Sequence, residues 1–229
     1  MTLTKPIWGS IVKPIVDSLD SGGIGEARNA PLIEVGTFSS PISTTGNQVV
    51  SLDNAIWGGK APKAVIFFQT PLATDTTTVN FTLGFGVGVS TSSSAVVSVY
   101  SDDAAANSIA DRRHDNSKCI TFSWSSGAVI EAASYVTDAT GDQFTVDWTQ
   151  NSATEYLYNF IAIGGDDVEV YLDEITSPTS TGPVAYTGVG FRPDALIGFG
   201  AVQSSTVPGS STGASMNLGI YDGTDSRQI

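Results

Sequence analysis

The sequence has few of the residues that most often carry chemistry. Its 229 residues include one cysteine, Cys119, and one histidine, His114. A single cysteine excludes an intrachain disulfide and a cysteine-based zinc cluster, and its apolar, alternating surroundings are typical of a small core residue. A Ser-His-Asp triad would have to use His114, whose setting, "DRRHDNS", is polar and contains no nucleophile elbow.

Positive charge is also scarce. The chain has 10 Lys and Arg against 23 Asp and Glu, which gives a formal net charge of −13. Between Cys119 and Phe191 there is no Lys or Arg, whereas ten acidic residues occur there. Nucleic-acid binding depends on cationic contacts with phosphates, so we expect neither DNA nor RNA as a partner.

Long hydrophobic runs are missing as well. No apolar stretch approaches the ~20 residues that a bilayer-spanning helix needs. Near the N-terminus, Lys13 and Asp17 interrupt the apolar pieces, so the apolar core of a secretory signal is absent. We expect a soluble chain with no membrane span and no export signal.

Motifs for nucleotides, proteases and metals are lacking too. The sequence contains neither G-x-x-x-x-G-K-[ST] nor H-E-x-x-H, and the glycines of "GFGVGV" lie in a strand pattern with no following helix. "DATGD" (Asp138–Asp142) and "GGDD" (Gly164–Asp167) offer oxygen ligands, but neither has the ligand spacing of an EF-hand. We therefore expect a non-enzymatic protein with no catalytic residues, cofactor or metal.

Turn residues and alternating apolar residues are abundant. Charged residues make up 14% of the chain, against about 25% in an average globular protein. In "VNFTLGFGVGV" (79–89) apolar residues alternate with small or polar ones, as in a half-buried strand. "AVIFF" (64–68) and "YLYNFIAI" (156–163) are runs of apolar residues, broken only by Asn159, which is typical of strands covered on both faces. The fold class predicted is all-β, an antiparallel sandwich or jelly roll, with one internal helical turn at most, in "DDAAANSIADRRHD" (102–115).

The first 32 residues have a helical period instead. Apolar residues recur at i, i+4 spacing, and we predict that they bind a partner: Ile7, Trp8, Ile11, Val12, Ile15, Val16 and Leu19. Pro6 and Pro14 suit first helical turns, so this arm is one kinked helix or two short ones. "DSGGIGEARNAP" (20–31) predicts a linker. A helix this short must bury its stripe, either on its own domain or, as the flexible linker favours, on another subunit.

Three phrases recur in the same order, which indicates a repeated β unit. "PKAVIFF" (62–68) matches "PDALIGF" (193–199), "NFTLGFG" (80–86) matches "SMNLGIY" (215–221), and "GNQVVSL" (46–52) resembles "TGPVAYT" (181–187). We expect a β-sandwich at 33–175, a linker at 176–183 and an incomplete second unit at 184–229. A half-sandwich leaves an open edge and core face. Either the native chain continues beyond Ile229, which we favour, or strands of a neighbouring subunit complete the unit.

The phrase "PKAVIFF", with the glycine-alternating strand and Asp-rich loop that follow, resembles a module of virion proteins of tailed bacteriophages. In that family a line like G-F-x-P-K-A-V-I-F opens a β domain, and copies occur in tandem. "IWGSIVKPIVDSL" (7–19) is similar to the arms that fix fibres, spikes or decoration proteins to the particle. The second copy departs from the pattern, with Asp194 in place of Lys63 and Gly198 in place of Phe67.

The resemblance implies a structural or adhesive virion protein and no catalytic residues. Its partners would be capsid, neck or tail proteins, further copies of itself, and host-surface glycans. A carbohydrate-binding module of a larger protein is the alternative, with Trp57, Trp124 or Trp148 as a stacking platform. The alternation around Trp124 and Trp148 indicates burial for these two residues.

Overall fold

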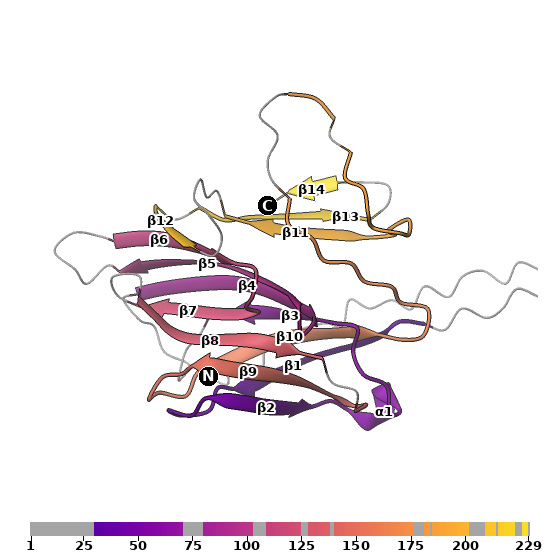
Figure 1. The fold of residues 1–229 in the computed structure, drawn as a ribbon, viewed down its shortest axis with the longest axis horizontal. Coiled ribbons are helices and arrows are strands. Elements are labelled where there is room, and N and C mark those ends of the chain that lie inside the picture. The colour runs from indigo at the N-terminus through magenta and orange to yellow at the C-terminus, as the bar shows by residue number, and fades with distance from the viewer. Residues whose placement is uncertain are drawn as a thin grey trace, which may run out of the picture.

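A computed structural model describes residues 30–70, 80–102, 109–124, 128–137, 140–175, 181–183, 185–201, 209–213, 215–222 and 226–228. Within these ranges the strands form antiparallel sheets of seven, four and three strands (Figure 1). The larger two face each other across a common core. The all-β antiparallel sandwich expected from the alternation is therefore confirmed. The helical arm predicted within residues 1–32 lies almost entirely outside the described residues.

The seven-stranded sheet has its members in the order β1 (Leu32–Ser39), β10 (Leu157–Gly164), β3 (Ala64–Gln69), β4 (Asn80–Ser90), β5 (Ser93–Asp102), β6 (Ile109–Asp115) and β12 (Gly209–Thr212). The four-stranded sheet has the order β2 (Gly46–Ser51), β9 (Gln143–Gln150), β8 (Ala128–Val136) and β7 (Ile120–Trp124). Strands β3 to β6 pair in succession, β7 to β9 do so in the second sheet, and β10 returns to lie between β1 and β3. Each sheet is therefore built mainly from strands that are neighbours in the sequence.

The core between these two sheets is rich in aromatic residues. Phe144 of β9 lies edge-on to Phe67 of β3, at 5.8 Å between ring centroids, and to Phe160 of β10, at 5.0 Å. Such pairs contribute about 0.5–1.5 kcal/mol each beyond the burial of their area. The buried cluster comprises Phe38, Val50, Leu52, Trp57, Val65, Phe67, Cys119, Ile120, Ala133, Tyr135, Phe144, Val146, Trp148, Tyr158, Phe160 and Ala162.

The glycine-bearing face of β4, and not its apolar face, points at the second sheet. A Cβ built on Gly86 would overlap the carbonyl oxygen of Cys119, and one on Gly88 would overlap the ring of Tyr135. Phe81, on the alternate face, is 52% exposed. The alternation correctly predicts a strand with two unlike faces. Close backbone approach, which only glycine permits here, decides which of them is inside.

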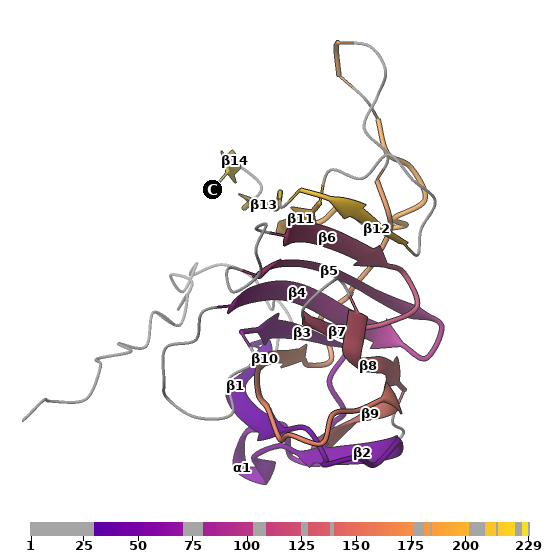
Figure 2. The ribbon, with the colours of Figure 1, turned by 90° about the vertical axis from the view of Figure 1, so that its left-hand side faces the viewer.

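Strand β7 is an edge of the four-stranded sheet, and it lies beside β4 and β5 of the large sheet (Figure 2). Gln69 Nε2 donates to the carbonyl of Cys119 at 3.2 Å, and its Oε1 accepts from the backbone N–H of Thr121 at 3.2 Å. Thr82 Oγ1 donates to the carbonyl of Ser123 at 3.1 Å. These bonds replace the ladder that a neighbouring strand would supply, so the edge is buried without orphaned backbone groups at these positions.

A short helix, α1 (Asn54–Trp57), closes one end of the sandwich. The side chain of Asp53 caps it by accepting from Ala55 N at 2.9 Å, and Gly58 ends it at φ 56°. The pattern Asp before and Gly after a four-residue turn is a helix signal that the sequence analysis left unused. The helical turn allowed for 102–115 is wrong for its described part, because residues 109–115 are strand β6.

The three-stranded sheet contains β11 (Leu196–Gly200), β13 (Asn217–Tyr221) and β14 (Ser226–Gln228), in that order. Strands β11 and β13 carry the second copies of the phrases that form β3 and β4, and both pairs are antiparallel. Between them in sequence, β12 joins the edge of the large sheet by pairing with β6. The C-terminal segment is thus attached to the sandwich, and its status as a second unit remains a prediction.

Candidate functional site

The seven arm residues predicted to bind a partner, Ile7, Trp8, Ile11, Val12, Ile15, Val16 and Leu19, lie outside the described residues. The described part of the chain presents a different candidate surface. We call it the outer apolar face, meaning the side chains of four strands that point away from the second sheet. Its members are Ile33 and Val35 of β1, Leu157, Ile161 and Ile163 of β10, Ile66 and Phe68 of β3, and Phe81, Leu83 and Phe85 of β4.

The pairing register places these residues in rows across the sheet. One row runs Val35, Ile161 and Ile66 and continues to the buried Val87 of β4, and the next row includes Phe68 and Phe85. Because side chains alternate between faces at every residue, directly paired residues share a face. The sequence interpretation that β3 and β10 are covered on both faces holds only in part, since Ile66, Phe68, Ile161 and Ile163 are half-buried.

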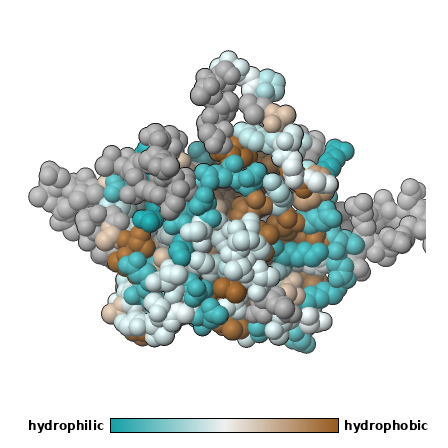
Figure 3. All heavy atoms as spheres, viewed as in Figure 1, coloured by the Kyte–Doolittle hydropathy of each residue, from teal (hydrophilic) through white to brown (hydrophobic). Residues whose placement is uncertain are grey.

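Coverage of the outer apolar face changes from one side of the sheet to the other. On β1, Val35 is 72% exposed and Ile33 is 40% exposed. On β5, by contrast, Val97 and Val99 are buried. The ring of Phe199 in β11 lies 6.3 Å from that of Phe85, so the three-stranded sheet approaches the face near β4. Apolar residues also reach the surface between that sheet and the rest of the molecule (Figure 3).

A buried carboxyl group, Glu131 of β8, was not singled out by sequence. It accepts hydrogen bonds from Ser40 Oγ at 3.0 Å, from the backbone N–H of Ser152 at 3.4 Å, and from the hydroxyl of Tyr158. Burial raises the pKa of Glu131, and these hydrogen bonds only partly oppose the effect. Its side chain is fully buried, so this carboxyl tunes stability and is not presented to a substrate.

His114, the residue that a Ser-His-Asp triad would have to use, lies on β6. Its Nδ1 is 3.9 Å from Glu174 Oε1 and its side chain is 16% exposed. Asn116 Nδ2 donates to the other oxygen of Glu174 at 3.3 Å. The neighbouring Arg112 donates to the carbonyl of Gly213 at 2.7 Å. Asn116, directly after β6, and Arg112 therefore fasten the segments around residues 174 and 213 to the large sheet.

Two of the three tryptophans considered for sugar stacking are inside the molecule. Trp57 and Trp148 are each 1% exposed. Trp57 Nε1 donates to Glu34 Oε2 at 2.7 Å, and Trp148 Nε1 donates to Gln48 Oε1 at 2.8 Å. The prediction of burial is confirmed for Trp148. Trp57 is buried as well, so it is not exposed for stacking on a sugar. The side chain of Trp124 is outside the described part.

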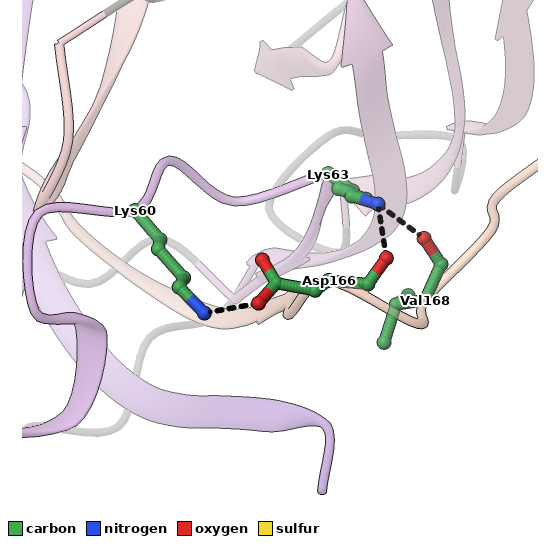
Figure 4. A network of polar contacts seen from close by, with 4 residues as sticks. All are labelled: Lys60, Lys63, Asp166 and Val168. Carbon is green, nitrogen blue, oxygen red and sulfur yellow. Dashed lines mark hydrogen bonds and ion pairs between the residues drawn. The ribbon is translucent and has the colours of Figure 1, made fainter. Parts of the chain in front are cut away.

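The acidic turns have partners within the protein. Asp142 Oδ1 accepts from the backbone N–H of Gly59 at 2.8 Å. Asp166 pairs with Lys60 at 2.6 Å, and Lys63 Nζ donates to the carbonyl of Val168 at 2.7 Å (Figure 4). The hydrogen bond from Lys60 and its charge lower the pKa of Asp166. Among the residues that the structure describes, no three His, Cys, Asp or Glu side chains are grouped so as to hold a metal ion.

An open groove lies beside this ion pair, lined chiefly by Pro62, Lys63, Val89, Val168, Val189 and Phe191. Its lysine already donates to the carbonyls of Asp166 and Val168. Thr137 and Glu169 add polar groups to the lining, but the groove is open to solvent and does not enclose a ligand as small-molecule sites do. The groove is therefore a weaker candidate than the outer apolar face.

No helix in the described ranges is long and apolar enough to cross a membrane. The chain was also compared with known proteins. No family profile, curated protein or solved structure is significantly similar to it.

Proposed function

We propose that this chain is a non-enzymatic structural protein of a phage virion. In this role the N-terminal arm docks on another virion protein, and the β units project as part of a fibre, spike or decoration, with host adhesion as a further role. The virion assignment derives from the resemblance of "PKAVIFF" and the arm to phage modules.

The observation that best supports a structural role is the outer apolar face. Apolar side chains line four adjacent strands of a rigid sandwich, and Val35 and Phe81 are more than half exposed. A monomer that stays alone gains nothing from such a surface, because each exposed Å² of apolar area forgoes roughly 25 cal/mol of burial energy. In an assembly subunit the same surface drives association.

The proposal is tested by asking whether the chain is in the particle. Virions released by the cells that encode it are purified through a density gradient, and their proteins are identified by mass spectrometry and immunogold labelling. We expect the chain at stoichiometric levels in the particle fraction. Its restriction to the cell lysate, with none in purified particles, would overturn the proposal.

The role of the arm is tested in the same particles. The paired substitutions Ile11→Asp and Ile15→Asp place charges in the apolar stripe, and we expect the chain to be lost from virions. The paired substitutions Ser10→Asp and Ser18→Asp add the same two charges outside the stripe positions and serve as the control, which should still be incorporated. Equal incorporation of both variants would show that the stripe is not the anchor.

The carbohydrate-binding alternative has less support. Two of its three tryptophans are in the core, where they cannot stack on a sugar. Their indole N–H groups are also engaged by Glu34 and Gln48. Binding to a glycan array would therefore be expected only as an adhesion function of the virion protein.

A further inference from the structure

We propose that the outer apolar face binds a second copy of this chain. In this dimer the exposed β1–β10 side of the face of each copy is covered by the β11–β13 sheet of the other. The inference deepens the proposed structural role. It rests on that role in one respect, which is that the chain associates with further copies of itself. It concerns surfaces in the described residues and is independent of the arm.

The first argument is that the small sheet already contacts the outer apolar face within one chain, at its β4 side. Phe199 of β11 lies against Phe85 of β4, with ring centroids 6.3 Å apart, and Phe85 in turn lies edge-on to Phe68 at 5.5 Å. The aromatic row continues the contact from the small sheet onto β3. The apolar side of the three-stranded sheet is therefore compatible with the outer apolar face of the large one.

The second argument is that each of the two surfaces has exposed aliphatic side chains that the intrachain contact does not cover. On the small sheet, Ile197 pairs with Ile220 and shares the face of Phe199, yet these two isoleucines are 48% and 45% exposed. On the large sheet, Val35, Ile33 and Leu157 are the exposed residues of the β1–β10 side, and Phe81 of β4 is exposed as well. Both sets of exposed aliphatic side chains are continuous with the intrachain contact, so they are suited to bury each other.

The third argument is symmetry. One copy has both an exposed β1 end and an exposed small-sheet end, so a two-fold axis lets each supply what the other lacks. The contact is then made twice, which doubles the apolar area removed from water. The dimer is closed and leaves no unpaired surface, whereas a heterologous contact that does not close would leave one at each end.

Charge gives this interface a distinguishing property. Each copy has a formal net charge of −13, so two copies repel each other, whereas the residues named for the contact are uncharged. Added salt screens the repulsion without weakening apolar contacts. We expect dimerisation to strengthen as salt rises, the opposite of an interface held by ion pairs.

The experiment uses the full chain and sedimentation analysis across a concentration series. Val35→Asp and Ile197→Asp each place a charge at a site at least 45% exposed, so the fold should be kept. We expect each to weaken dimerisation at least about tenfold, because burying an unpaired carboxylate is costly. Val49→Asp is the matched control: Val49 is 53% exposed on β2 of the other sheet, and this variant should dimerise like the unaltered chain.

A second measurement keeps the test decisive. Chains with Val35→Cys and chains with Ile197→Cys are mixed under oxidation; Cys119 is buried, and burial raises its pKa, so it does not compete. We expect a covalent dimer in the mixture and none from either chain alone. A monomer at all concentrations, no cross-link in the mixture, or an equal loss with Val49→Asp would overturn the dimer. Absence of the chain from virions would overturn the proposed function instead.

Discussion

At the scale of single residues, Glu131 couples the stability of the fold to pH. Its carboxyl is buried between the sheets and is held by Tyr158, Ser40 and the backbone of Ser152. Ionising a carboxyl in such a place costs free energy that three hydrogen bonds only partly recover. Desolvation therefore leaves its folded-state pKa above the ordinary value of 4.5.

The sign of the pH dependence follows from that shift. A group with a raised folded pKa contributes stability that is fully present below its unfolded pKa and is lost as pH rises through the folded one. Glu131→Gln removes this term while keeping an acceptor oxygen. We expect its free energy of unfolding, relative to the unaltered chain, to increase as pH rises from about 4 to 8. The measurement is urea denaturation at several pH values, with exposed Glu155→Gln as a control; parallel curves for Glu131→Gln and the unaltered chain would contradict the expectation.

Gly86 gives a sharp prediction about packing. Its missing side chain is what allows the carbonyl of Cys119 to approach β4, so Gly86→Ala forces backbone apart and should cost about 2–4 kcal/mol in chemical denaturation. Gly198, in the second copy, is the control. A Cβ there would be 3.8 Å from Leu196 Cδ2, an ordinary contact, so Gly198→Ala should change stability by less than about 0.5 kcal/mol. Similar costs for both variants would refute the close-approach argument.

At the scale of elements, strand β7 shows how a buried sheet edge is satisfied. The side-chain amide of Gln69 presents one donor and one acceptor to the carbonyl of Cys119 and the N–H of Thr121, as a backbone peptide would. The side-chain amide of Gln69 thus joins the two contacting sheets by making the hydrogen bonds that the backbone of a neighbouring strand would make. The sequence offers no local sign of this, because the bonded residues are 50 and 52 positions apart.

Gln69→Leu tests this role while nearly preserving volume. It leaves a buried carbonyl and N–H unpaired, at a cost of about 1–3 kcal/mol for each group. We expect the free energy of unfolding to fall by about 2–4 kcal/mol and the Thr121 amide to exchange faster with solvent. The exposed Gln150→Leu is the control and should change neither quantity appreciably. Unchanged exchange at Thr121 in Gln69→Leu would mean that the edge is protected by other means.

Some strands were predicted from the sequence, some only in part, and some elements were missed. Period-two alternation predicted strands in segments that became β4, β7 and β9. The same alternation could not say that the glycines of β4 are inside, since both faces repeat every second residue. Helix α1 could have been predicted from its N-cap residue Asp53 and its C-cap residue Gly58. Strand β6 was missed because its polar and charged residues mask the alternation of a strand.

At the scale of the whole molecule, the C-terminal segment is joined to the sandwich at two places. Strand β12 extends the large sheet beside β6, and Phe199 of the three-stranded sheet lies on Phe85. The contact is apolar and small, so this sheet should open more readily than the aromatic core.

Phe199→Ala tests that attachment. We expect amide protection in β11 and β13 to fall more than about tenfold, while the core strands β3, β9 and β10 keep theirs. Leu196→Ala is the control: Leu196 lies on the opposite face of the same strand and is 45% exposed, so its loss should leave the protection unchanged. Hydrogen exchange at low protein concentration makes the measurement, and global loss of protection would show that the two parts unfold as one.

The sequence by itself determined that this chain is built of antiparallel strands, because short-range alternation and turn residues act within a few positions of each other. Its composition also determined the negative net charge, which repels partners that are themselves negatively charged. The tertiary structure decided which face of β4 is buried, which side chain completes the β7 edge, and which apolar residues are left at the surface. Each of these depends on the approach of segments that are dozens of residues apart, a distance over which a periodic pattern carries no information.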